Sequence, residues 1–139
     1  MAYRIPWEVL TENKTLKTKN MNTFVYIVDS KIIINDENET FVLCIFPFVA
    51  MTWNKAMKFA KQRNCLVPTI KQLTLIFKHM DKINDCLKSL KQEKIIENEW
   101  FWTSEELCSS CSYYVGFNSG YSYPQSKNYP CYVQFIKNI

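Results

Sequence analysis

The hydrophobic pattern begins with two short apolar runs that predict a β-hairpin. Residues 23–29 (TFVYIVD) and 31–35 (KIIIN) are rich in β-branched side chains and surround the turn Asp29-Ser30. That turn lacks the glycine of the strongest hairpin signals. A second turn at residues 35–38 (NDEN) leads into the apolar run 41–46 (FVLCIF). A short continuous apolar run of this kind is consistent with a buried strand.

The pattern changes to a helical period after Thr52. The next apolar residues recur at positions i, i+3, i+4 and i+7, namely Trp53, Ala56, Met57 and Ala60. This spacing places them on one face of a helix. A helix is therefore expected over residues 53–63, with Thr52 as its N-cap.

A second helix is expected after Pro68. Thr69 and Gln72 have the spacing of a capping box, in which each side chain bonds the backbone N–H of the other residue. The apolar stripe that follows comprises Leu73, Ile76, Phe77 and Met80, then, after a break near Asp81, Ile83, Leu87 and Leu90. A polar connection over residues 91–99 follows this helix.

Beyond this connection the pattern is again that of strands. Residues 100–102 (WFW), 113–117 (YYVGF), 121–123 (YSY) and 131–136 (CYVQFI) predict an antiparallel meander, with a turn at Asn118-Ser119-Gly120. Strands, two helices and strands in this order predict an α+β fold. The two helices are expected to pack on an antiparallel sheet formed by both ends of the chain.

Length and composition indicate one globular domain. The chain has 139 residues, of which 47% are hydrophobic and 22% charged, so it can bury a core. No repeat or low-complexity tract divides it, and residues 23–139 are expected to form the domain, preceded by an N-terminal arm or lead-in at residues 1–22. Lys, Asn and Ile are abundant and Gly is rare, which indicates an A/T-rich genome such as that of a bacterium or phage.

The distribution of charge argues against nucleic acid as a partner. The net charge is +4 and the basic residues are spread along the chain, with only two arginines, Arg4 and Arg63. Nucleic-acid surfaces concentrate charge and favour arginine. The first ten residues lack the apolar core of a signal peptide, and the run 41–51 is too short to cross a bilayer. Synthesis in the cytoplasm without membrane insertion is therefore expected.

The six cysteines, at positions 44, 65, 86, 108, 111 and 131, are expected to be mostly reduced structural thiols, because no export signal is visible. Cys108 and Cys111 have the spacing of half a zinc site or of a redox motif. No second pair with this spacing completes a zinc ribbon, and the pair lies in a Ser-rich loop. A loop disulfide, spare thiols and a metal or redox site remain open for it.

Several sequence pieces between residues 41 and 139 are informative through their order and spacing. They are MTWNKAM (51–57), LVPT (66–69), Ile83-Asn84 with Leu87, WFWTSE (100–105), YVGF (114–117), NSGY (118–121) and Tyr132-Val133. In this order they resemble the C-type-lectin-like fold of gut bacteria and their phages. This branch includes the variable, ligand-binding proteins of diversity-generating retroelements and is related to the formylglycine-generating-enzyme fold.

The resemblance implies recognition of a partner by the last strands and their loops. Carried over by position, it implies contacts through Asn118, Ser119, Tyr121, Tyr123, Gln125, Lys127, Asn128 and Tyr129. The residues themselves agree, because six tyrosines lie between positions 113 and 132. Tyrosine offers a large contact area at a low cost in rotamer entropy. The alternative is that about half of these rings pack within the sheet as cross-strand pairs.

Catalytic chemistry has little support in the sequence. The sole histidine, His79, would need a cysteine brought beside it by the fold. Glu105 and Glu106 are adjacent and point to opposite sides of an extended chain. No acidic residue follows Glu106, so calcium binding of the lectin type is not expected. No catalytic residue, metal or cofactor is therefore predicted.

The sequence thus predicts a non-enzymatic recognition or assembly domain that binds a protein or cell-surface ligand through its C-terminal aromatic face. The expected setting is a phage virion, as a head decoration, fibre or tail-associated protein, with other virion proteins or further copies of the chain as partners. A bacterial cytoplasm or surface is the alternative location. The alternative functions are a retroelement-diversified binding protein and a small thiol- or metal-dependent enzyme that uses Cys108 and Cys111.

Overall fold

The computed structural model describes residues 23–139, and within them the chain forms three helices and two antiparallel sheets. The strands are β1 (Phe24–Val28), β2 (Lys31–Asn35), β3 (Thr40–Leu43), β4 (Trp100–Cys108), β5 (Cys111–Gly116), β6 (Ser122–Ser126) and β7 (Ile136–Asn138). The helices are α2 (Trp53–Gln62), α3 (Ile70–Lys78) and α4 (Met80–Ser89). The α+β class predicted from the sequence is confirmed. The arm expected at residues 1–22 lies outside the described residues.

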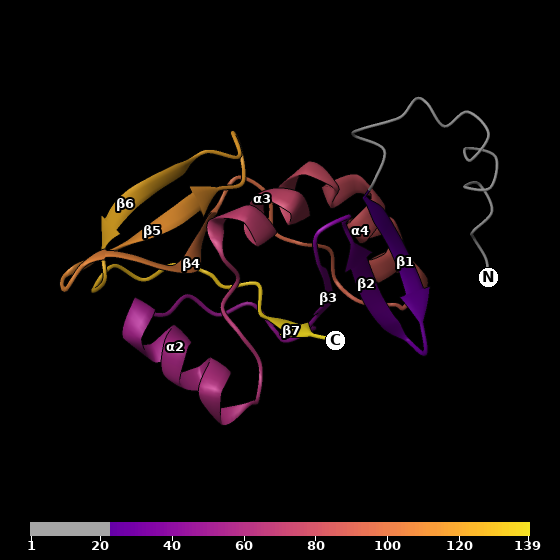
Figure 1. Ribbon diagram of the computed structural model, residues 1–139, viewed down its shortest axis with the longest axis horizontal. Helices are drawn as coiled ribbons and strands as arrows, with labels where there is room; N and C mark the ends of the chain where they lie inside the picture. Colours follow the sequence, from indigo (N-terminus) through magenta and orange to yellow (C-terminus); the bar gives the residue numbers. More distant parts are fainter. Residues whose placement is uncertain (1–22) are drawn as a thin grey trace.

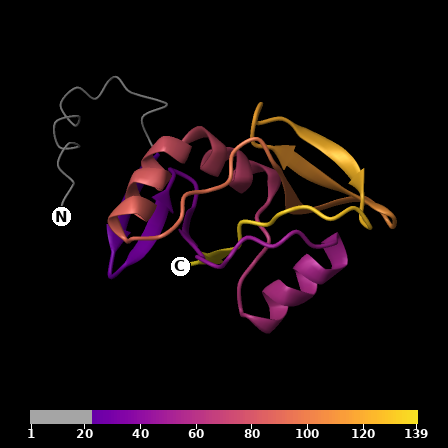
Figure 2. The ribbon, with the colours of Figure 1, turned by 180° about the vertical axis from the view of Figure 1, so that it is seen from behind.

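The two sheets lie at opposite ends of the molecule, with α3 and α4 between them (Figure 1). The first sheet has the strand order β1-β2-β3-β7, and the second has the order β4-β5-β6. Seen from behind, the segment of residues 131–136 runs between α2 and α3 toward β7 (Figure 2). Each sheet is therefore held to the rest of the molecule by helices and by this connecting segment.

The predicted hairpin of β1 and β2 is confirmed, and its turn explains how it forms without glycine. Val28 pairs with Lys31 across the two-residue turn. Asp29 and Ser30 both have positive φ, 52° and 63°. Two successive residues of this kind are what a type I′ turn requires, and its twist matches that of the strands. Aspartate tolerates this conformation better than most residues other than glycine.

The last segment of the chain departs from the prediction. Residues 131–136 were expected to complete the C-terminal meander, but the meander ends at β6, and β7 pairs instead with β3, with Leu43 opposite Ile136. Cys131, Val133 and Phe135 pack in the core cluster around α2. Tyr132 contributes to the other cluster. Neighbouring residues of the segment are therefore buried in two different core clusters. This burial produces an apolar pattern in the sequence that resembles the pattern of a strand.

The helix ends follow their sequence signals in part. The capping box of α3 is present: Gln72 N–H donates to Thr69 Oγ1 at 3.1 Å, and Thr69 N–H donates to Gln72 Oε1 at 2.9 Å. Thr52 is the N-cap of α2, as predicted, but its side chain makes no capping hydrogen bond. The long second helix is interrupted at His79, so three helices form where two were expected.

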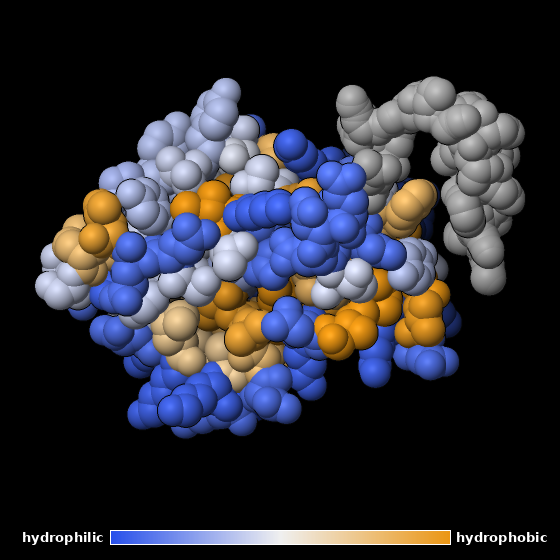
Figure 3. All heavy atoms as spheres, viewed as in Figure 1, coloured by the Kyte–Doolittle hydropathy of each residue, from blue (hydrophilic) through white to orange (hydrophobic). Residues whose placement is uncertain are grey.

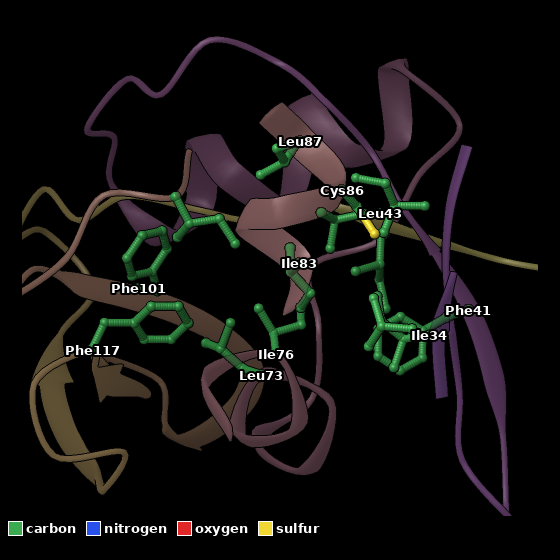
Figure 4. Close-up of a cluster of buried hydrophobic side chains, with 14 of the residues drawn as sticks. Ile34, Phe41, Leu43, Leu73, Ile76, Ile83, Cys86, Leu87, Phe101 and Phe117 are labelled. Atoms are coloured by element: carbon green, nitrogen blue, oxygen red, sulfur yellow. The ribbon is translucent and has the colours of Figure 1, made fainter. Parts of the chain in front are cut away.

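The larger core cluster lies between the two sheets. Leu73 and Ile76 of α3 and Ile83 of α4 are fully buried. They lie between aromatic rings of the second sheet and residues of the first, including Phe101 and Phe41 (Figure 4). The predicted apolar stripe of these helices is therefore the layer that joins the two sheets. Full burial of such side chains contributes roughly 1.5–3 kcal/mol each.

Candidate functional site

One face of the second sheet carries a row of aromatic side chains. Trp102 of β4 lies opposite Tyr114 of β5, and Tyr114 lies opposite Tyr123 of β6. Because side chains alternate along a strand, Trp100 shares this face. Phe101, its neighbour in β4, is on the opposite face and is fully buried in the core. The sheet therefore has one face in the larger core cluster and a second, aromatic face, on which Trp102 is fully buried and Trp100 and Tyr114 pack against the core cluster around α2.

These rings are in contact with one another. Trp100 stacks on Tyr114 with ring centroids 4.2 Å apart and an interplanar angle of 20°. Tyr123 meets Trp100 edge to face at 5.7 Å. Gln125 donates from Nε2 to the Tyr114 hydroxyl at 3.3 Å. Aromatic pairs in such arrangements contribute roughly 0.5–1.5 kcal/mol beyond their buried area. The contacts hold the rings in defined positions.

Tyr121 and Tyr129 lie on either side of β6 in the sequence, and both are exposed. Burial raises the pKa of the Tyr114 phenol, the hydrogen bond with Gln125 opposes this rise, and Cys131 and Tyr129 add to it. Tyr121 accepts at its carbonyl from Gly116 N–H at 3.1 Å. We call the set Trp100, Tyr114, Tyr121, Tyr123 and Tyr129 the aromatic face.

The two glycines of the chain lie at the end of β5 and in the turn that follows it, and each has a structural reason. At Gly116, which pairs with Trp100, a Cβ would come 2.9 Å from the indole ring. At Gly120, φ is +81° and a Cβ would come 2.7 Å from the ring of Phe77 in α3. Phe77 also contacts Phe117, at a centroid distance of 5.4 Å. The turn that carries Asn118 and Ser119 is therefore packed directly on α3.

The structure leaves most of the residues predicted to bind a partner exposed. Tyr121, Tyr129 and Tyr123 have exposed fractions of 66%, 51% and 44%. Asn118, Ser119 and Asn128 are also exposed, whereas Gln125 is partly buried beside Tyr114. Ser119 supports the backbone, since its hydroxyl accepts from Tyr121 N–H at 3.3 Å.

Lys127 has to be removed from the predicted contact residues. Its side chain is only 8% exposed, and its ammonium is paired with Glu106 and lies 4.4 Å from the centroid of the Trp53 ring. Its backbone N–H donates to Ser110, and its carbonyl accepts from Trp53 N–H. Lys127 is therefore an anchor for the loop that carries Asn128 and Tyr129. Lysine residues in loops are usually exposed, and the sequence alone does not indicate that Trp53 and Glu106 lie next to Lys127. Its burial could therefore not be predicted.

The C-terminal tyrosines divide into exposed rings and packed rings. Tyr121, Tyr123 and Tyr129 are exposed. Tyr132 packs inside, with ring centroids 6.0 Å from Phe101, and Tyr114 is stacked within the sheet. Trp100 belongs to the site although the prediction did not include it. The pairing of Trp100 with Gly116 would have identified it. This strand register depends on the tertiary structure, so it could not be predicted from the sequence.

The tip of the β4–β5 hairpin places two thiols together at one edge of this sheet. Cys108 and Cys111 are cross-strand partners with sulfur atoms 3.0 Å apart. Next to them, Leu107 is 52% exposed. A small group of hydrophobic atoms marks this end of the molecule, while the surface over β6 is intermediate in hydropathy (Figure 3). His79 is elsewhere, at the junction of α3 and α4, where burial lowers its pKa, as does the neighbouring Lys78.

Comparisons with known proteins place the chain in no family: no family model matches it, and no curated protein sequence does. Within residues 23–139, no three or more His, Cys, Asp or Glu side chains gather as a metal site would require. No helix in the described part of the chain is long and apolar enough to cross a membrane. The candidate site therefore has to be argued from its own geometry.

Proposed function

We propose that this protein is a non-enzymatic recognition or assembly domain that binds a macromolecular partner through the aromatic face. The observation that carries the proposal is the exposure of Tyr123 on a sheet whose rings are already packed in place, with Tyr121 and Tyr129 exposed on either side of the same strand in the sequence. Tyrosine and tryptophan dominate the energetics of binding surfaces because they bury large areas and lose little side-chain entropy. A preorganised platform lowers the entropic cost further.

The surroundings of these rings favour a large partner over a small molecule. Two hollows of the surface, of about 330 and 410 Å³, are lined by residues of other elements, and neither includes a ring of the aromatic face. Small-molecule sites are concave and enclose most of their ligand. Around the rings, Asn118, Ser119 and Asn128 supply exposed hydrogen-bonding groups. Such a mixture of tyrosine with small polar residues is typical of binding loops.

The arrangement of the chain supports a C-type-lectin-like relationship as part of this proposal. The last strand, β7, pairs with β3 of the N-terminal half, and the helices and the second sheet lie between them in sequence. The proposed binding residues then fall in the second sheet and its loops, as they do in the proteins that the sequence resembles. The proposal extends to a phage virion component as the setting, with a retroelement-diversified binding protein as its alternative.

A site-specific photo-crosslinking experiment tests the proposal without knowledge of the partner. The photoreactive residue p-benzoylphenylalanine would replace Tyr121 in the full chain, produced in the cells that naturally make it. The matched control carries the same residue in place of Phe24, which is 42% exposed on β1 at the far end of the molecule. Crosslinked products would be separated by mass and identified by mass spectrometry. Irradiation of the purified chain alone shows whether the partner is a second copy.

We expect one or a few discrete crosslinked products from position 121 and none in common with position 24. Substitution of Tyr123 and Tyr129 by serine in the Tyr121-labelled chain should reduce the yield of these products at least tenfold. Equal product patterns from the two positions, or no product from position 121 in cells and in the purified chain, would show that the aromatic face is not a binding surface.

A further inference from the structure

The hairpin tip combines the exposed Cys108 and the partly exposed Cys111 in a geometry that lets their thiols react with each other. Cys108 ends β4 and Cys111 begins β5, and the two residues are directly opposed in the antiparallel ladder. Opposed residues in such a ladder have Cα atoms about 4.5–5.5 Å apart, which lies within the range of about 4.4–6.8 Å found in disulfides. The sulfur atoms are 3.0 Å apart, about 1 Å more than a disulfide bond.

We propose that Cys108 and Cys111 form a thiol–disulfide exchange site that reacts with low-molecular-weight disulfides and closes to a cross-strand disulfide. The pair lies outside the aromatic face, so this proposal does not depend on the proposed binding of a partner. Only a small rotation of side chains is needed to join sulfur atoms that are already in contact. In residues 23–139 no third metal-ligating side chain gathers with the pair, which favours exchange over metal binding.

The environment of the tip distinguishes the two thiols and assigns their roles. With both thiols protonated, Cys108 donates to Cys111 Sγ. As a thiolate, Cys108 accepts hydrogen bonds from the Ser110 hydroxyl, from the Cys111 thiol and from the Ser110 backbone, and these lower its pKa to about 7. The same contact with Cys108 raises the pKa of Cys111. The geometry agrees, because Cys108 is the more exposed of the two and its sulfur lies closer to the Ser110 hydroxyl, at 3.4 Å against 3.8 Å for Cys111. Cys108 is therefore the attacking thiolate, and Cys111 is the resolving thiol that keeps its proton until the second step.

The remaining four cysteines provide an internal contrast. Burial raises the pKa of Cys44 to about 11 and that of Cys131 to about 12. Burial also raises the pKa of Cys65 and of Cys86. Thiolates are the reactive species, so these four thiols are expected to be inert in the folded protein. Reaction with an external disulfide should therefore select the hairpin tip.

The proposed reaction balances without any other reactant. The Cys108 thiolate attacks one sulfur of the small disulfide RSSR, the S–S bond breaks, and RS⁻ leaves with the electron pair. Cys111 then loses its proton to solvent, its sulfur attacks Cys108 Sγ in the mixed disulfide, and a second RS⁻ leaves. The two protein thiols lose two electrons in total, RSSR is reduced to two RSH, and the two thiol protons end on these products.

The rate advantage of Cys108 follows from its thiolate fraction and its nucleophilicity. At pH 7 a thiol with a pKa of about 7 is about half ionised, roughly fiftyfold more than a thiol with the ordinary pKa of 9.0. A Brønsted slope of about 0.4–0.5 reduces the intrinsic nucleophilicity by roughly eightfold over that interval. Cys108 should therefore react roughly sixfold faster than an unperturbed exposed thiol.

The test uses 4,4′-dithiodipyridine with the full-length protein, because each displaced half of this disulfide absorbs light. Wild-type protein should release two equivalents rapidly and become lighter by two hydrogen atoms. Cys111→Ala should release one rapid equivalent and retain a mixed disulfide on Cys108. Cys108→Ala should lose the fast phase. The rate for Cys111→Ala should rise with pH through a pKa between about 7 and 9.0, because the variant keeps the hydrogen bonds from Ser110 but loses the one from Cys111. Peptide mapping of the wild-type product locates the bond even where a variant fails to fold.

Two results would overturn the proposal. One is a fast phase of the same size in Cys108→Ala as in the wild type, which would place the reactive thiol elsewhere. The other is a wild-type product that remains a mixed disulfide at Cys108, because Cys111, whose sulfur is in contact with that of Cys108, should have displaced the second thiol and formed the protein disulfide. Circular dichroism of each variant checks that the fold is unchanged.

Discussion

The burial of Lys127 leads to an asymmetric prediction for its ion pair with Glu106. The lysine side chain is 8% exposed, whereas the glutamate side chain is 53% exposed. Replacing Lys127 by Met removes a buried charge and leaves a carboxylate that water can solvate. Replacing Glu106 by Ala leaves the buried ammonium with the face of Trp53 as its remaining charge-stabilising contact. We therefore expect Glu106→Ala to be the more destabilising of the two.

The magnitudes follow from the same burial. Lys127→Met loses a cation–π contact and a half-exposed ion pair, together about 1 kcal/mol. Breaking a fully buried pair costs about 3–5 kcal/mol. Water reaches the carboxylate here, so Glu106→Ala should cost about 2 kcal/mol. The double variant should cost about 1 kcal/mol, as Lys127→Met does, because the unpaired buried charge is gone.

Urea unfolding followed by far-ultraviolet circular dichroism measures these differences, and thermal unfolding should show shifts of about 4 °C per kcal/mol. Glu105→Ala serves as a neighbouring carboxylate control, since Glu105 Oε2 accepts from Ile70 N–H and does not pair with Lys127. Equal costs for Lys127→Met and Glu106→Ala would contradict this prediction, as would a double variant whose cost is the sum of the two single ones.

Two further predictions concern backbone and capping. Gly120→Ala should destabilise the protein by about 2 kcal/mol or more, because φ is +81° and the added Cβ would lie 2.7 Å from the ring of Phe77. Thermal unfolding measures this cost, with Asn118→Ala in the same exposed turn as the control. Equal unfolding midpoints for the two variants would contradict the prediction. Thr69→Ala should cost about 1 kcal/mol, because it removes the capping bond to Gln72. The side chain of Thr52 makes no capping hydrogen bond, so Thr52→Ala should cost less than half as much as Thr69→Ala. A lower urea midpoint for Thr52→Ala than for Thr69→Ala would show that the capping box does not stabilise α3.

Local patterns in the sequence were sufficient for most of the secondary structure. The β1–β2 hairpin, the start of α2 at Trp53 and the capping box of α3 are set by side chains within a few residues of each other. Such signals depend on short-range sterics and hydrogen bonds, so they are visible without the fold. The family resemblance, and no local pattern, singled out Tyr121 and Tyr123 as contact residues, and both side chains are exposed.

Only the tertiary structure decided how distant segments meet. It placed residues 131–136 between two core clusters and β7 beside β3, where the local pattern predicted a further strand of the meander. It buried Lys127 between Trp53 and Glu106 and brought Trp100 over Gly116. Side-chain type and periodicity specify which residues avoid water, but the partner of each is chosen by packing and strand register across the whole chain.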